Sequence, residues 1–203
     1  MGTPVFAYGA RKIGGKDATK SNIESVKRVA AFLRTALGPR GASKLIVQTK
    51  NSFIVSSSGS TLISSLREEN PAFKVIKEIA TIQEKELGDG IKTTIILIGE
   101  LLKNAEKLIE EKVHPNIVVK GYDEALKEAI KILKSLSIPV GLENTKILNQ
   151  TAKTAINNMF LSHSNLKEKF SKMAVKAVKH LSLIHISEPT RPLYISYAVF
   201  CLK

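Results

Sequence analysis

A short glycine-rich turn, Gly88-Asp89-Gly90, holds the residue types best suited to chemistry in this chain of 203 residues. Its two glycines let the backbone turn sharply and approach a ligand closely. The apolar run after it predicts a long helix, whose first free N–H groups and positive dipole end attract an anion such as phosphate. Asp89 would then suit a Mg²⁺ ion that bridges phosphate oxygens. The alternative is an ordinary helix end, turn and helix start, because short glycine motifs recur by accident.

A second glycine turn, Leu37-Gly38-Pro39, ends the first predicted helix. That helix is expected from Ser21 to about Leu37, because Ser21 and Glu24 form a capping box and apolar residues follow at helical spacing. After the turn, two short apolar runs at residues 44–47 and 53–55 flank a polar turn and predict a β-hairpin. Each glycine turn therefore joins two regular elements.

Further helices are expected as scaffold. Asn70 and Pro71 supply an N-cap and a first helical proline, and His114 is expected as a cap or surface residue before Pro115. The helix after the Gly88 turn is apolar almost all round from residue 95 to residue 102, which predicts a central buried element. In the helix after Pro115, the residues expected to face inward are Ile117, Val118, Ala125, Leu126, Ala129, Ile130 and Leu133.

Four stretches of the sequence resemble successive blocks of the group II chaperonins, the family of the archaeal thermosome and the eukaryotic cytosolic chaperonin. They are RTALGPRGASKLIV, NPAFKVIKEIATIQEKELGDG, TTIILIGELLKNAEKLI and HPNIVVKGYDEAL, and they occur in the family's order. The resemblance covers about residues 11–181. It implies a mainly α fold, in which the helical bundle of a chaperonin equatorial domain carries a projecting β-hairpin and leads into the start of an intermediate domain.

The resemblance also implies an ATP-binding subunit of a ring that assists protein folding. Its ligands would be ATP or ADP with Mg²⁺, and its partners would be other chaperonin subunits, in a homo- or hetero-oligomeric ring, and unfolded client proteins. In the family, the LGP turn packs against the nucleotide and the GDG loop holds phosphate and magnesium, so Asp89 is the expected metal ligand. The expected nucleotide-binding residues are Leu37, Gly38, Pro39, Gly88, Asp89, Gly90, Lys92, Thr93 and Thr94.

The sequence departs from the family directly after the GDG loop. Where the family has a run of threonines that clasp phosphate, this chain has Ile91 and Lys92 before Thr93 and Thr94. Ile91 can offer only its backbone. Lys92 can act as a point charge for phosphate or can point to solvent, and the sequence leaves both open.

Two more departures concern ATP hydrolysis. Ser58 stands where the family usually has an Asp that helps to order the metal and the attacking water, and Met159 stands where it tends to have a phosphate-sensing lysine. A further family carboxylate belongs to a C-terminal segment that this sequence does not contain. No catalytic residue is therefore assigned. A subunit of a hydrolysing chaperonin and a degenerate structural ring paralogue that does not hydrolyse ATP both stay open.

The resemblance divides the chain into three parts. Residues 1–158 correspond to the N-terminal part of the equatorial, nucleotide-binding domain, and residues 159–181 to the start of the intermediate domain. Residues 182–203 match nothing in the family and are interpreted as a non-native tail, because their apolar and aromatic residues lack capping or turn signals. The alternative for this tail is a genuine edge strand. We expect the chain to be an N-terminal fragment of a longer subunit.

The hairpin is expected to serve assembly. A two-stranded ribbon is marginal alone, and its apolar runs need cover on at least one face. By resemblance, strands of a neighbouring subunit provide that cover. Ile46→Lys or Ile54→Lys should then weaken ring assembly more than subunit folding.

Composition adds exclusions. The net charge of +13 raises nucleic acid or an anionic membrane as a partner, so a basic nucleic-acid-binding helical module is a second alternative function. Lysines spread over helix faces and an aromatic content of 5% favour a solvated surface instead. The single cysteine and the lack of a secretory signal or membrane-spanning run predict a cytoplasmic protein with no membrane partner. A Walker-type phosphate loop is excluded by its spacing requirement.

Overall fold

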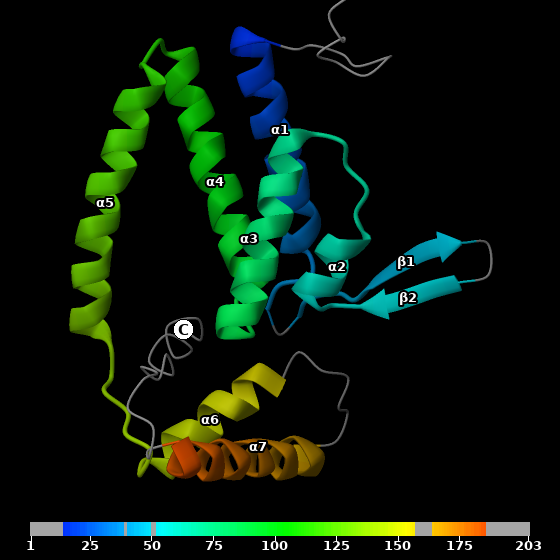
Figure 1. The fold of residues 1–203 in the computed structure, drawn as a ribbon, viewed down its shortest axis with the longest axis vertical. Coiled ribbons are helices and arrows are strands. Elements are labelled where there is room, and N and C mark those ends of the chain that lie inside the picture. The colour runs from blue at the N-terminus through cyan, green and yellow to red at the C-terminus, as the bar shows by residue number, and fades with distance from the viewer. Residues whose placement is uncertain (1–13, 39, 50–51, 157–163, 186–203) are drawn as a thin grey trace, which may run out of the picture.

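The computed structural model describes residues 14–38, 40–49, 52–156 and 164–185. These residues form seven helices and one two-stranded sheet, which confirms the predicted mainly α fold with a hairpin (Figure 1). In chain order the elements are α1 Gly15–Arg34, β1 Lys44–Thr49, β2 Ser52–Ser56, α2 Gly59–Ser65, α3 Pro71–Leu87, α4 Ile91–Glu110, α5 Pro115–Leu136, α6 Thr145–Ile156 and α7 Ser164–His185.

The core lies between α1, α2, α3 and α4. α1 and α4 pack along each other, and α3 lies beside both (Figure 1). The large side chains that lose all or nearly all contact with solvent are Leu33 of α1, Leu62 and Ile63 of α2, and Ile95 of α4. Full burial of such a side chain contributes about 1.5–3 kcal/mol. This cluster therefore fixes the ends of these helices, where both glycine turns lie.

The start of α1 differs from the prediction. The helix begins at Gly15, so Ser21 lies inside it and the predicted capping box is wrong. Asp17, an acid in the first turn, favours this earlier start because it interacts well with the helix dipole. Ser21 instead accepts two hydrogen bonds from Asn70 Nδ2, one at its carbonyl and one at its hydroxyl, both of 3.3 Å. Asn70 also caps α3 as predicted, since its Oδ1 accepts from the N–H of Ala72 at 2.8 Å.

The hairpin forms with the predicted strands. β1 and β2 are antiparallel, and Ile46 pairs with Ile54 at the centre of the ribbon. Ile46 packs against the core cluster. The opposite face of the ribbon is apolar and exposed in this chain, and it carries Leu45, Val47, Phe53 and Val55.

The prediction for α4 was only half right. Ile95 and Gly99 are buried, but Leu97 and Leu101 on the opposite side are exposed. Helix α4 therefore has one buried and one exposed face even where residues 95–102 are apolar almost all round. The reason is that α1 and α3 cover one side of it, and α5 reaches only its C-terminal part.

The predicted inward face of α5 is wrong in this structure. Of its residues only Val118 is buried, while Ile117, Leu126, Ile130 and Leu133 are exposed. Helix α5 diverges from α4 after their connecting turn (Figure 1), and Tyr122 Oη donates a 2.6 Å hydrogen bond to the carbonyl of Leu101 near that turn. His114 acts as the predicted cap, since its Nδ1 accepts from the N–H of Asn116 at 3.2 Å.

Helices α6 and α7 pack against each other. Lys179 Nζ of α7 donates to Thr145 Oγ1 of α6 at 2.7 Å. Helix α7 continues to His185, so it includes the first residues of the segment predicted as a tail. The predicted boundary at residues 158 and 159, with Met159, lies outside the described residues, and the three-part domain division stays a prediction. No helix among the described residues has the length and apolar character needed to span a membrane.

Candidate functional site

The loop between α3 and α4 consists of Gly88, Asp89 and Gly90. Gly88 has φ of 72° and Gly90 has φ of 81°, a backbone region that other residue types rarely adopt. The N–H of Gly88 donates to the carbonyl of Glu84 at 3.0 Å and closes α3, and Gly90 directly precedes α4. Both glycines are thus required by the backbone itself. The predicted ordinary helix end and start are present, and they are compatible with a ligand site at the same place.

Asp89 is exposed on this loop. Its Oδ1 accepts a 2.7 Å hydrogen bond from the N–H of Gly90, and its carbonyl accepts one of 2.9 Å from Gln83 Nε2. The second carboxylate oxygen, Oδ2, forms no hydrogen bond with any described residue. Asp89 is therefore held in place through one oxygen and has the other available for a cation.

The first turn of α4 presents the features of an anion site. Gly90 provides no side-chain cap, and the helical ladder begins with the N–H of Thr94, which donates to the carbonyl of Gly90 at 2.9 Å. The N–H groups of residues 91–93 precede that ladder and have no partner within the helix. Thr93 is exposed and Thr94 is half-buried. The free N–H groups are donors of the kind that suits an oxyanion, and the two hydroxyls belong to the same helical turn.

Lys92 joins this turn to the other glycine turn. Its Nζ donates a 2.8 Å hydrogen bond to the carbonyl of Ala36, the residue that precedes Leu37 and Gly38. Burial lowers the pKa of Lys92, and the negative charge of Asp89 partly opposes this effect. The alternative in which Lys92 points to solvent is therefore wrong.

The turn after α1 is compact. Gly38 has φ of 82°, and its carbonyl accepts from the N–H of Gly41 at 2.9 Å. A β-carbon added to Gly41 would lie 2.6 Å from the carbonyl oxygen of Ala36, so the chain folds back on itself here. Leu37 is exposed, and Pro39 lies outside the described residues. The turn presents Leu37 and its backbone next to the point that Lys92 contacts.

A third segment, residues 58–59, completes the arrangement. Ser58 precedes α2, and its Oγ lies 3.1 Å from the Oγ of Ser60. A β-carbon added to Gly59 would lie 3.1 Å from both Ile91 Cβ and Lys92 Cγ. Residues 36–38, 58–59 and 88–94 therefore meet at the end of the bundle where α1 and α3 end and α4 begins (Figure 1).

Two members of this site were missed at the sequence level. The sequence could not indicate a role for the carbonyl of Ala36, because every residue type has a backbone carbonyl oxygen. Gly59 had a weak signal, since it directly follows Ser58, and its role is to let two backbones approach closely. A polar groove of about 220 Å³ between α2 and α3 borders this region, with Ser60 at one side and Glu84 at the other.

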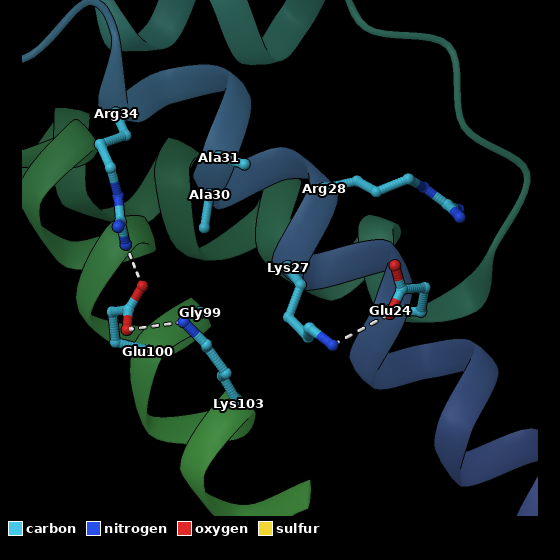
Figure 2. A pocket seen from close by; sticks show the side chains of 9 residues that line it. All are labelled: Glu24, Lys27, Arg28, Ala30, Ala31, Arg34, Gly99, Glu100 and Lys103. Atoms are coloured by element: carbon cyan, nitrogen blue, oxygen red, sulfur yellow. Dashed lines mark hydrogen bonds and ion pairs between the residues drawn. The ribbon is translucent and has the colours of Figure 1, made fainter.

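A larger groove of about 350 Å³ lies between α1 and α4 (Figure 2). Arg34 is paired there with Glu100, and Lys27 Nζ lies 2.7 Å from Glu106 and 3.1 Å from Glu24. Hydrogen bonds to Glu106 and Glu24 raise the pKa of Lys27. Because these charges neutralise one another, we interpret the groove as a helix-packing seam.

The donor set at the GDG loop limits the kind of metal site. Within the described parts of the chain, no group of three or more His, Cys, Asp or Glu side chains could hold a metal ion. Mg²⁺ is commonly bound through one or two carboxylates together with phosphate oxygens and water. Asp89 thus fits a Mg²⁺ ion that arrives with a phosphate ligand.

Comparison with known proteins supports the resemblance seen in the sequence. Residues 29–186 match the TCP-1/cpn60 chaperonin family. Thermosome subunit beta of Aeropyrum pernix is 36% identical over 181 residues, which cover 88% of this chain and 33% of the relative. Thermosome subunit alpha of Archaeoglobus fulgidus is 34% identical over 185 residues, which cover 90% of this chain and 33% of the relative.

A thermosome subunit of Methanothermococcus thermolithotrophicus is 36% identical over 174 residues, which cover 86% of this chain and 32% of the relative. The chain thus spans about a third of the length of the curated relatives it matches. The family match covers most of the chain, including the loops that meet at the end of the bundle. With its helical bundle and hairpin, the chain belongs to the TCP-1/cpn60 chaperonin family, as a group II member.

Proposed function

We propose that this chain binds adenine nucleotide at the GDG loop and acts as part of a group II chaperonin ring that assists the folding of other proteins. One observation carries the proposal: the hydrogen bond from Lys92 to Ala36 joins the two glycine turns that the family uses for nucleotide. The site residues are those named from the sequence, and Pro39 among them lies outside the described residues.

Each part of the site has a role in this proposal. The free N–H groups at the start of α4 and the hydroxyls of Thr93 and Thr94 donate hydrogen bonds to phosphate oxygens. Asp89 would hold a Mg²⁺ ion, which would supply positive charge against the phosphates. Leu37 and Gly38 contact the nucleotide through an apolar side chain and a backbone turn. Lys92 adds a positive charge beside the phosphates.

The same geometry favours a second candidate, a ring subunit that binds nucleotide without hydrolysing it. Gly59, the residue after Ser58, packs against the start of α4, so a carboxylate at position 58 could order an attacking water there, but the Ser58 hydroxyl is neutral and contacts Ser60 instead. This second candidate keeps the nucleotide site and lacks a carboxylate at position 58. No described feature favours the nucleic-acid alternative, which a salt-dependent shift assay tests.

Partners and location follow from the same proposal. The apolar face of the hairpin, with Leu45, Val47, Phe53 and Val55, is proposed to dock on a neighbouring chaperonin subunit, because a sheet edge and an apolar surface together suit strand addition. Unfolded proteins are the proposed clients of the full-length protein, and the cytoplasm is the proposed location.

Calorimetric titration with ADP and Mg²⁺ tests the binding proposal. The chain should give saturable heat, and Asp89→Ala should weaken binding measurably, by up to about threefold. Asp123→Ala is a matched control, because Asp123 is an exposed acid on α5 that pairs only with Lys127 among the described residues. Equal affinity of the Asp89 variant and the control would contradict the role of Asp89, and absence of binding by the unchanged chain would contradict the nucleotide site.

A further inference from the structure

Lys92 is an unusual residue for the first turn of a helix. A cation there faces the positive end of the helix dipole, which disfavours it. The side chain is half-buried, and no carboxylate of the described residues lies within salt-bridge distance of its Nζ. Such an arrangement leaves a positive charge incompletely neutralised inside the proposed nucleotide site.

The surroundings of Lys92 fix where this charge lies. Its Nζ donates to the carbonyl of Ala36, and the stem of the side chain lies against the backbone of Gly59. An ammonium group has three donors, and this hydrogen bond uses one of them. The charge is thereby held at the turn after α1 by a residue that belongs to the first turn of α4.

Asp89 is coupled to the same charge. The carboxylate acts on Lys92 electrostatically, three residues away along the loop and first helical turn. A carboxylate that already has a cation nearby contributes less net negative charge to the site. The repulsion between Asp89 and a nucleotide phosphate, which a metal ion would otherwise have to overcome, is therefore smaller.

We propose that Lys92 is a built-in cation of the nucleotide site, so that this chain binds ADP or ATP with little dependence on Mg²⁺. This inference rests on the proposed nucleotide-binding function. The inference depends on the charge of Lys92. A threonine at this position would bring a hydroxyl and no charge, so only the metal and the helix N-terminus would neutralise the phosphates. The other reading of the contact is purely structural, with Lys92 serving only to hold the turn at Ala36.

A titration with and without metal distinguishes a role of Lys92 as a cation from a purely structural role. ADP binding would be measured in Mg²⁺ and again in EDTA for the unchanged chain, Lys92→Met, Lys92→Thr and Lys92→Arg. Methionine matches the length of lysine but has neither charge nor donor, and arginine keeps both. Circular dichroism and thermal melting would establish that each variant is folded.

For the unchanged chain, we expect the Kd to rise by less than about threefold when EDTA replaces Mg²⁺. For Lys92→Met and Lys92→Thr, the same change should raise the Kd by about tenfold or more, since the positive charge proposed to act on the phosphates is lost. Lys92→Arg should restore the small metal effect. The comparison on the unchanged chain needs no variant, so a variant that fails to fold does not prevent the test.

Three results would overturn the inference. The first is ADP binding by the unchanged chain that is lost in EDTA, which leaves the nucleotide site intact but makes it metal-dependent. The second is an equal loss of affinity for Lys92→Met in both conditions, which would mean that Lys92 only holds the turn. The third is no ADP binding in either condition, which would contradict the proposed function as well.

Discussion

Gly99 of α4 faces Ala30 of α1 so closely that a β-carbon added to Gly99 would lie 2.3 Å from Ala30 Cβ. Such a separation is far below the usual contact distance of about 3.5–4.0 Å between carbon atoms. The two helices can approach in this way only because Gly99 has no side chain. Since α4 begins at the GDG loop, the contact also fixes the position of the loop relative to α1.

Gly99→Ala should therefore destabilise the fold. We expect the free energy of unfolding to fall by about 1–3 kcal/mol, because overpacking outweighs the helix propensity gained on replacing glycine. Urea denaturation measures the change. Gly121→Ala is the control: Gly121 of α5 has no atom within 4 Å of an added β-carbon, so this variant should be more stable by about 0.5–1 kcal/mol. A stabilised Gly99→Ala protein would show that the helices lie farther apart.

The pair of Arg34 and Glu100 should make stability depend on acid pH. Its hydrogen bond to Arg34 holds the pKa of the Glu100 carboxyl below the usual value of 4.5. The stability that the pair contributes is thus present above that value and lost as pH falls through the lowered pKa. Melting temperatures measured from about pH 6 to about pH 3 should fall less steeply for Glu100→Gln than for the unchanged chain.

Arg34→Met removes the same bond from the other side and should have the same effect on the pH profile. Because both side chains are roughly half exposed, the difference between the profiles should be small and should shrink in high salt. Parallel profiles for all three proteins at low salt would show that the pair does not persist in solution.

The structure of the hairpin changes which substitution best tests subunit association. Ile46 packs against the core, so Ile46→Lys should impair folding as well as assembly, contrary to the expectation from sequence. Phe53→Lys lies on the exposed face and should weaken subunit association while the melting temperature stays nearly unchanged. Sedimentation of a protein long enough to assemble measures the association. Intact rings with Phe53→Lys would remove this face from the interface.

Ser58→Asp should raise ATP turnover in a longer form of the protein. The backbone of the next residue, Gly59, contacts the start of α4, so a carboxylate at position 58 would lie beside the phosphate loop. Positioned acid or base groups contribute about 10²–10⁴-fold to rate, which sets the scale of the expected gain. Phosphate release measures the rate. An unchanged rate with intact nucleotide binding would place the defect at another residue.

The features that the sequence predicted well depend on local geometry. The left-handed Gly88 and Gly90 and the Asn70 cap each follow from residue types that few other conformations accommodate. The turn at Gly38 was likewise predicted from its residue types. These positions are determined within a few residues of chain, so a single sequence carries enough information for them.

The features that were missed depend on distant surfaces. The bond between Lys92 and Ala36 joins residues 56 positions apart, and no local pattern distinguishes it from a lysine in solvent. The apolar row of α5 illustrates the converse error. An amphipathic pattern shows that a face suits burial, but whether a packing surface covers that face depends on the rest of the assembly.

The GDG loop has a consequence for how its parts can be varied by experiment. Gly88 and Gly90 have positive φ angles, and Asp89 between them does not, so only the central residue can change its side chain without backbone strain. Substitutions at Asp89 would therefore report on charge, coordination and the hydrogen bond to the N–H of Gly90, without backbone strain. Substitutions at the flanking glycines would add that strain, and comparing the two data sets would distinguish side-chain chemistry from backbone geometry within three consecutive residues.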